Sequence, residues 1–381
     1  MSETATGLTA DLRELCRTIY ENPELGYHEF RAAEAIAAMV EKYGIAVERR
    51  YCGLETAFRA DFGSADGPVF AFPAEYDALA GAGHACGHNL IATAAVAAFL
   101  STAAALAAEK LPGRAVLLGT PAEETYGGKI ELLNRGGFAG IDSCMLSHPF
   151  RCSAIDRDNL AVSRYDVTFS GTPAHAAAAP EQGVNALDAM TLLLTGIGLY
   201  RQQMPQGCRI HGIVTDGGQA PNIIPGRTTA FYYLRADRDE KIARLAECFR
   251  RMAEGAALMT GCRAEVTERD HAYLTSRTNA ALNAAAAEAM TRAGLEPQTV
   301  EERISSDYGN VSQVIPGVNI FFGIFPPGEA TAALHSGEFQ KAAGTEFAFR
   351  QALKTGEAMK EVALRYFRDA VFRRAVQDAA D

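Results

Sequence analysis

The stretch Gly83-His84-Ala85-Cys86-Gly87-His88-Asn89 places a thiol and an imidazole two positions apart in a run of small residues. In extended backbone, residues i and i+2 point to the same side, so the side chains of Cys86 and His88 can converge on one point. The glycines leave the backbone free to bend and to approach a small ligand. The pair indicates a metal site, although a buried free thiol beside an incidental histidine explains it equally well when it is considered alone.

The composition is that of a globular protein with more than one hydrophobic core. The chain has 381 residues, of which 48% are hydrophobic and 22% charged, and this length suits two domains of ordinary size. Its net charge of −10 argues against a nucleic-acid binder. The Ala-rich apolar run 91–108 predicts a buried helix rather than a membrane span.

The N-terminal residues and the cysteines lead us to expect a cytoplasmic protein. Residues 1–11 lack the basic region and following apolar run that are typical of a signal peptide. Eight cysteines are scattered along the chain without a CxxC motif. In a chain of this length, that pattern favours reduced thiols over a disulfide framework.

Strands alternate with helices through the first 150 residues. Apolar residues at helical spacing predict helices over 10–22 and 29–43. Short apolar runs predict strands, which cover residues 46–51, 56–62, 69–74, 114–120 and 143–147. The alternation favours an α/β fold with a mixed sheet flanked by helices, in which a ligand binds beyond the carboxyl ends of the strands.

The pattern changes near residue 162 and changes back near residue 272. Between them we predict strands and helices in the order β-α-β-β-α-β, at 163–170, 185–203, 209–215, 228–235, 239–259 and 263–268. This is the order of a small α+β ferredoxin-like domain. A helix at 279–293, a strand at 319–323 and one long final helix at 344–376 then resume the α/β pattern. We therefore interpret 162–272 as a domain inserted into a parent domain of residues 1–161 and 273–381.

Further candidate ligands stand at the ends of predicted elements. Glu123 and Glu124 come directly after a strand, and adjacent residues of extended chain face opposite ways, so one carboxylate can reach a metal while the other stays available. His148 ends another strand, and His335 precedes the final helix. Taken singly, a Glu-Glu pair is more often a solvated turn, and each histidine is unremarkable.

The candidate donors are a thiol, a carboxylate and three imidazoles: Cys86, His88, Glu124, His148 and His335. This set suits zinc, manganese or another divalent ion. Five donors are too many for one tetrahedral site and match two ions that share a bridging ligand and a bridging water, an arrangement that hydrolyses amides. Glu123 then remains as the general base that takes a proton from the water and delivers it to the leaving amine.

Four motifs in the chain resemble those of a known family: Ala74-Glu75-Tyr76-Asp77-Ala78-Leu79, Ala85-Cys86-Gly87-His88-Asn89, Pro121-Ala122-Glu123-Glu124 and Gly171-Thr172-Pro173-Ala174-His175-Ala176. They are similar to motifs of the aminoacylase/carboxypeptidase family of di-metal amidohydrolases, a metallopeptidase family. The most similar branch contains aminobenzoyl-glutamate hydrolases, indole-acetyl-amino-acid hydrolases and certain dipeptidases. The resemblance runs from about residue 10 to 365 and keeps the motifs in order.

The resemblance implies a di-zinc exopeptidase-like catalytic domain with an inserted lid domain that also dimerises. It assigns the five donors above to two divalent metal ions per subunit, Zn2+ or Mn2+, with Glu123 as the base. Asp77 would orient one of the metal ligands. The resemblance also implies a homodimer or higher homo-oligomer that acts on a small-molecule substrate, without nucleic acid or membrane partners.

Four further residues take their expected roles from the resemblance. His175 would polarise the scissile carbonyl, often across a dimer interface. Asn222 and Arg235 match substrate-contacting positions. Arg235 can hold a carboxylate through two parallel hydrogen bonds, although an ion pair with a nearby aspartate, Asp237 or Asp239, explains it equally well. Asp307 serves either substrate recognition or packing.

The chain departs from the family pattern near the Glu-Glu pair. Thr125 and Tyr126 stand where related chains often have glycine, and Tyr126 can narrow the cleft. The expected metal ligands are unaffected by this change. The substrate's size and polarity do not follow from the motifs.

We therefore predict a metal-dependent hydrolase that cleaves the amide bond of a small N-acyl amino acid, aryl amide or dipeptide. The alternative is a metal-dependent deaminase that releases ammonia from an aromatic or heterocyclic amine, since activated water can attack either centre. A cysteine hydrolase with Cys86 as nucleophile and His88 as base leaves the Glu pair and two distant histidines without a role. A non-catalytic binding protein is compatible with the fold, but Glu123 argues against it.

Overall fold

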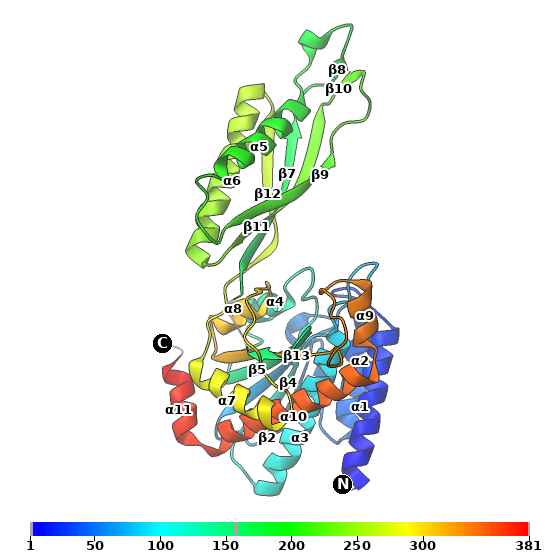
Figure 1. The fold of residues 1–381 in the computed structure, drawn as a ribbon, viewed down its shortest axis with the longest axis vertical. Coiled ribbons are helices and arrows are strands. Elements are labelled where there is room, and N and C mark those ends of the chain that lie inside the picture. Colours follow the sequence, from blue (N-terminus) through cyan, green and yellow to red (C-terminus); the bar gives the residue numbers. More distant parts are fainter. Residues whose placement is uncertain (1–2, 156–158, 380–381) are drawn as a thin grey trace. The chain divides into compact units, whose positions relative to one another are not determined.

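A computed structural model describes residues 3–155 and 159–379 of the chain (Figure 1). The described residues form two compact units. The first comprises residues 3–155, 276–302 and 310–379, and the second comprises residues 159–275 and 303–309. The short helix α8 (Tyr308–Ser312) contains the boundary between residues 309 and 310.

The first unit is built on a mixed sheet with the strand order β1-β2-β4-β3-β5-β13-β6. The strands are β1 (Val47–Arg49), β2 (Phe58–Gly63), β3 (Val69–Ala74), β4 (Arg114–Gly119), β5 (Ser143–Phe150), β6 (Ala154–Ile155) and β13 (Gly317–Gly323). The central pairs β4–β3, β3–β5 and β5–β13 are parallel, and the outer pairs are antiparallel. The mixed sheet flanked by helices that the sequence predicts is confirmed.

Helices pack against this sheet around a long central helix, α3. The helices and one 3-10 turn are α1 (Glu3–Glu21), α2 (Phe30–Lys42), η1 (Tyr51–Gly53), α3 (His88–Glu109), α4 (Gly128–Asn134), α7 (Ala280–Arg292), α9 (Gly337–Ala343), α10 (Glu346–Arg368) and α11 (Ala370–Asp378). By length and composition alone α3 could cross a membrane, but 78% of its most apolar window is buried. It packs against β3, β4 and β5 and contacts α1 and α10, so it forms the core of this unit.

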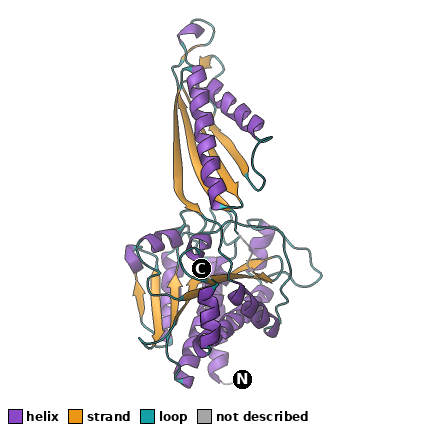
Figure 2. Ribbon diagram, turned by 90° about the vertical axis from the view of Figure 1, so that its left-hand side faces the viewer, coloured by secondary structure: helices purple, strands orange, loops and turns teal. Residues whose placement is uncertain are grey.

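The second unit has the predicted β-α-β-β-α-β order. Its main elements are β7 (Ala161–Ser170), α5 (Ala186–Tyr200), β9 (Arg209–Asp216), β11 (Arg227–Ala236), α6 (Asp239–Thr260) and β12 (Arg263–Tyr273). The antiparallel strands are ordered β12-β7-β11-β9, and α5 and α6 pack side by side on one face of the sheet (Figure 2). Alternate residues of β11 are buried, because only one face is covered. A small ribbon adds β8 (Ala174–His175), η2 (Pro180–Gln182) and β10 (Ile223–Ile224).

Segment 303–309 belongs to the second unit, whereas the sequence pattern assigns it to the parent domain. The amide of Leu160 donates to the carbonyl of Ile304 (2.8 Å), and Nη1 of Arg235 donates to Oγ of Ser305 (2.7 Å). These contacts join residues far apart in the chain, so local patterns cannot reveal them. The roles of the two units as catalytic domain and lid or dimerisation domain stay predictions.

The prediction of one long final helix is wrong. The predicted range 344–376 contains α10 and most of α11, and α10 ends where Asp369 adopts an extended conformation (φ −112°, ψ 101°). The Asp369 side chain accepts hydrogen bonds from the amides of Val371 and Phe372 (2.9 and 3.0 Å) and so begins α11. Aspartate favours this capping position over a helix interior.

Candidate metal centre

The five predicted donors come from four segments of the first unit and lie together. Cys86 lies in the turn before α3, and His88 is the first residue of α3. Glu124 lies in the turn after β4, and His148 lies in β5. His335 lies two residues before α9. The sheet and α3 thus bring together side chains up to 249 positions apart (335 − 86).

Two groups of three donors share the thiol of Cys86. One contains Cys86, His88 and His148, the other contains Cys86, Glu124 and His335, and within each group the donor atoms lie within 4.8 Å of one another. Sγ of Cys86 is 3.3 Å from Nε2 of His148. Nε2 of His335 is 3.7 Å from Oε2 of Glu124. Two cations with one shared thiolate fit this arrangement.

The buried donor atoms of His88 and Glu124 support this fit. Nδ1 of His88 donates to Oδ1 of Asp77 (2.9 Å), which leaves Nε2 facing Oε1 of Glu124 at 3.5 Å. Among the described residues, neither Nε2 of His88 nor Oε1 of Glu124 has a hydrogen-bond partner. Unpaired buried polar atoms are costly, and cations bound by the two groups would satisfy both of them.

The histidine of β5 is also oriented by its second ring nitrogen. Nδ1 of His148 donates to the backbone carbonyl of Pro149 (2.7 Å), so Nε2 faces Cys86 as an acceptor. Burial lowers the pKa of His148 to about 4, which keeps the imidazole neutral. A neutral imidazole held by a carbonyl is the form that binds metal ions.

The electrostatics of the site favour a cation. Burial, together with Glu124 and Glu123, raises the pKa of the Cys86 thiol well above its ordinary value. Burial opposes the charged form of His88, but the carboxylates of Asp77, Glu75 and Glu124 outweigh it and raise its pKa to about 10. The carboxylates contribute to both shifts by favouring the protonated form, and in His88 they outweigh burial. A divalent cation would replace the protons on the thiol and the imidazole.

Turns, rather than extended chain, aim Cys86 and His88. Gly87 has a left-handed conformation (φ 76°, ψ 29°) and immediately precedes α3. A Cβ atom at this position would lie 2.5 Å from Cγ of Pro149, so glycine is required for the close approach. The amide of His335 donates to the carbonyl of Ala85 (3.0 Å), which joins the His335 turn to the Cys86 turn.

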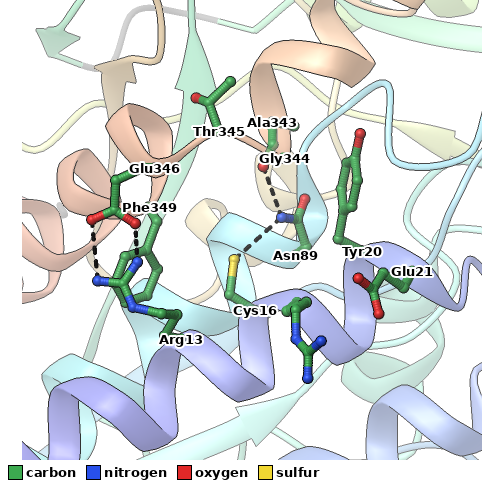
Figure 3. A pocket seen from close by; sticks show the side chains of 11 residues that line it. Arg13, Cys16, Tyr20, Glu21, Asn89, Ala343, Gly344, Thr345, Glu346 and Phe349 are labelled. Atoms are coloured by element: carbon green, nitrogen blue, oxygen red, sulfur yellow. Dashed lines mark hydrogen bonds and ion pairs between the residues drawn. The ribbon is translucent and has the colours of Figure 1, made fainter.

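Asn89 strengthens the connection between α3 and the segment that follows His335. Its Nδ2 donates to the carbonyl of Ala343 (3.0 Å) and to Sγ of Cys16 (3.3 Å), as Figure 3 shows. Ala343 is the last residue of α9. The first turn of α3, which carries His88, is therefore fixed to the helix that begins just after His335.

A tight turn carries Glu123 and Glu124. Ala122 has a left-handed conformation (φ 59°), and its carbonyl accepts from the amides of Tyr126, Gly127 and Gly128 (3.2, 3.0 and 3.3 Å). The amide of Glu124 donates to Oδ2 of Asp77 (2.9 Å). Glu123 is buried, and one carboxylate oxygen lies within 4.8 Å of donor atoms of His88 and Glu124.

His175 and Asn222 come together on the small ribbon of the second unit. Ile223 pairs with His175, and the amide of Ala176 donates to the carbonyl of Asn222 (3.0 Å). His175 is exposed, and its Nδ1 accepts from the amides of Ala177 and Ala178 (3.2 and 3.1 Å). Its neutral ring therefore carries the proton on Nε2, where it can serve as a donor.

Arg235 does not form the ion pair that the sequence leaves open. Its Nη1 donates to Oγ of Ser305 (2.7 Å), and its Nε contacts Nε2 of His211 (3.2 Å). Asp237 pairs with Lys241 instead, at 2.7 Å. Burial lowers the pKa of Arg235. Within the described part of the chain its guanidinium has no carboxylate partner.

The remaining candidate, Asp307, is fully buried in segment 303–309. Its two expected roles, substrate recognition and packing, both stay predictions.

Sequence reasoning missed two buried charges beside the centre. Nζ of Lys129 lies 2.6 Å from Oε1 of Glu75, and both side chains are buried. Oε2 of Glu75 is 3.6 Å from Nε2 of His88. Glu75 stands inside the first of the four family motifs, and this position could have marked it as a residue of the site. Lysine in a short helix ordinarily indicates an exposed face, so no signal marked Lys129.

Comparisons with known proteins identify the family of the chain. Residues 69–348 match the profile of Peptidase family M20/M25/M40. The chain is 39% identical to Xaa-Arg dipeptidase of Mus musculus over 96% of this chain and 86% of that protein. It is 32% identical to a subunit of the p-aminobenzoyl-glutamate hydrolase of Escherichia coli K12 over 70% of this chain and 59% of that protein.

A solved structure has the same fold. It is a dinuclear metal-binding peptidase of the M20 family from Bacillus subtilis, with a TM-score of 0.70 and 21% identity over 94% of this chain and 99% of that one. The resemblance to the metallopeptidase family that the motifs indicate is thus confirmed. The chain belongs to Peptidase family M20/M25/M40 and is a hydrolase.

Proposed function

We propose that this hydrolase cleaves the amide bond of a dipeptide or small N-acyl amino acid at a centre of two divalent cations, Zn2+ or Mn2+. The observation that carries the proposal is the thiol of Cys86, which belongs to both groups of three donors, with Glu123 beside them. Cys86, His88 and His148 would hold one cation, and Cys86, Glu124 and His335 the other. The names of the two relatives, a dipeptidase and an aminobenzoyl-glutamate hydrolase, support this substrate class.

Each side chain has a distinct part in the proposed reaction. Cations bound here supply Lewis acidity, which lowers the pKa of water and polarises the amide carbonyl. Glu123 takes a proton from the attacking water and delivers it to the leaving amine. Asp77 holds the ring of His88 and the amide of Glu124 in position. The Nε2 proton of His175 suits the oxygen that becomes negative as the carbonyl is attacked.

Removal of metal tests the proposal directly. Dialysis against a chelator should abolish turnover, and Zn2+ or Mn2+ should restore it. A panel of dipeptides, N-acyl amino acids and aryl amides, assayed for both amide cleavage and ammonia release, separates the proposed reaction from the deaminase alternative. Full activity in a preparation shown by elemental analysis to be metal-free would exclude both metal-dependent reactions.

The surroundings of Arg235 favour a substrate with a free carboxylate. The half-buried guanidinium, without a carboxylate partner among the described residues, can bind such a group through charged hydrogen bonds. These bonds are worth about 1.5–3 kcal/mol. We expect Arg235→Ala to raise KM roughly 10- to 100-fold, with a smaller effect on kcat.

Steady-state kinetics on the best substrate of the panel measure this effect. Arg227, exposed on the same strand, provides the control, since Arg227→Ala should leave KM unchanged. Equal KM values for the Arg235→Ala variant and the wild type would rule out the carboxylate role.

We also propose that the protein is a homodimer. Strand β9 lies at an edge of the second unit's sheet, where Ile213 and Val214 are 63% and 40% exposed. An edge strand with exposed apolar residues invites pairing with another strand, here that of a second copy. Light scattering should give twice the mass of one chain, and a monomeric mass at micromolar concentration would contradict the proposal.

A further inference from the structure

The loop between α1 and α2 contacts both turns that support the candidate metal centre. The amide of Ala78, next to Asp77, donates to the carbonyl of Glu24 (2.8 Å). The amide of Ala122, next to Glu123, donates to Oε1 of Glu29 (2.7 Å). The loop also approaches the second turn closely, because a Cβ atom on Gly26 would lie 2.9 Å from Cβ of Ala122. One loop therefore contacts and supports both the segment that carries Asp77 and the segment that carries Glu123.

Glu29 is fully buried and uses both carboxylate oxygens. Oε1 accepts from the amide of Ala122, and Oε2 accepts from Oγ1 of Thr56 (2.8 Å). Burial and the nearby carboxylate of Asp77 raise the pKa of Glu29 to about 7. A carboxylate in such a place is costly to stability, and side chains of this kind are concentrated at functional sites.

The residue that Glu29 holds has an unusual backbone conformation. Ala122 is left-handed (φ 59°), a conformation that alanine rarely adopts without support from its surroundings. Its carbonyl is held by three amides of the same turn, and its amide is held by Glu29. Two positions further on, the amide of Glu124 is held by Asp77. Two buried carboxylates thus fix the backbone on either side of Glu123.

We propose that Glu29 is a positioning residue that fixes the Glu123–Glu124 turn relative to the other donors of the metal centre. It acts through the amide of Ala122 and does not touch the substrate. The inference rests on the proposed function, in which Glu124 binds a cation and Glu123 is the base. Loss of the Glu29 contact would let Ala122 relax and would move both carboxylates.

Glu29→Ala tests this role through the affinity for metal as well as through activity. The variant removes both acceptors and leaves the amide of Ala122 unpaired. We expect Zn2+ affinity, measured by competition with a chelating dye, to fall roughly 10- to 100-fold. The value of kcat should fall by a similar factor while KM stays unchanged. In Glu29→Gln, one oxygen can still accept from Ala122, so most of the affinity should return.

A second glutamate of the same loop provides a matched control. The carboxylate of Glu24 accepts from the amides of Arg31 and Ala32 at the start of α2 (2.9 and 3.0 Å). These contacts do not involve the Glu123 turn. Glu24→Ala removes contacts to two backbone amides, whereas Glu29→Ala removes one contact to an amide and one to a hydroxyl. Glu24→Ala should therefore lower the melting temperature, with unchanged Zn2+ affinity. If both variants weaken Zn2+ binding equally, a general loosening of the loop is responsible and the positioning role is wrong.

Two further results separate the inference from the function on which it rests. A wild-type protein that binds neither Zn2+ nor Mn2+ contradicts the proposed function and the inference together. A wild type that binds Zn2+ and a Glu29→Ala variant with the same affinity and kcat contradict only the inference. If Glu29→Ala does not fold, Glu29→Asp replaces it, because the shorter carboxylate keeps the charge but cannot reach Ala122. Wild-type Zn2+ affinity in a folded Glu29→Asp variant would equally overturn the role.

Discussion

Glu123→Gln is expected to lower kcat by roughly 10²- to 10⁴-fold and to leave the metal content unchanged. Glutamine has the size and shape of glutamate but cannot accept a proton from water at neutral pH. Glu123 is buried beside the donors of His88 and Glu124, yet it is not needed to complete either group of three donors around Cys86. Metal binding should therefore survive while proton transfer is lost. Single-turnover rates and elemental analysis of the same preparation measure both.

Glu131→Gln is the control for this substitution. Glu131 lies on α4, shortly after the Glu123 turn, and forms a surface ion pair with Arg135 (2.7 Å). Such pairs contribute little, so this variant should have wild-type kinetics. A Glu123→Gln variant that turns over at a near-normal rate, with both cations bound, would remove Glu123 from the base role.

Cys86→Ser is expected to weaken the binding of both cations. The thiol is common to the two groups of donors, so its loss weakens each site at once. A serine hydroxyl does not ionise near neutral pH and is a poor ligand for zinc. Because a few ligands supply the whole binding free energy of a zinc site, we expect a fall in affinity on the order of 10²-fold or more at each site. Elemental analysis after dialysis should find less than one ion per chain.

Two other variants make this result specific. Cys144 is a buried thiol of β5 that belongs to neither group of donors, so Cys144→Ser should retain two cations. His148 belongs to only one group, so His148→Ala should release one cation and keep the other. Two ions at wild-type affinity in Cys86→Ser would contradict the shared-thiolate arrangement.

The sequence was informative about the centre because its donors stand at the ends of strands and the start of a helix. Patterns of apolar residues locate those ends, and α/β folds gather the carboxyl ends of strands at one place. Cys86, His88, Glu124, His148 and His335 were found in this way, and the structure brings their donor atoms together. The premise of extended chain was wrong, however, because Gly87 and Ala122 have left-handed conformations that turn the backbone.

The sequence could not identify the charged side chains that are buried in the folded protein. Glu29 and Lys129 have the sequence context of ordinary surface residues, yet both are buried. Burial depends on which distant segments pack over a side chain, and neighbours in the chain carry little information about that. The partner of Arg235 was undetermined for the same reason, since Ser305 lies 70 positions further along the chain.

By itself, the sequence determined the family, the alternation of elements in both units and the chemical types available for catalysis. These properties are local, because apolar periodicity and short motifs depend on residues that are close together in the chain. Only the tertiary structure decided which donors share one thiol, which carboxylates hold the Glu123 turn and where the final helix breaks. These depend on distances of a few ångströms between remote segments, which are set by the packing of the whole unit.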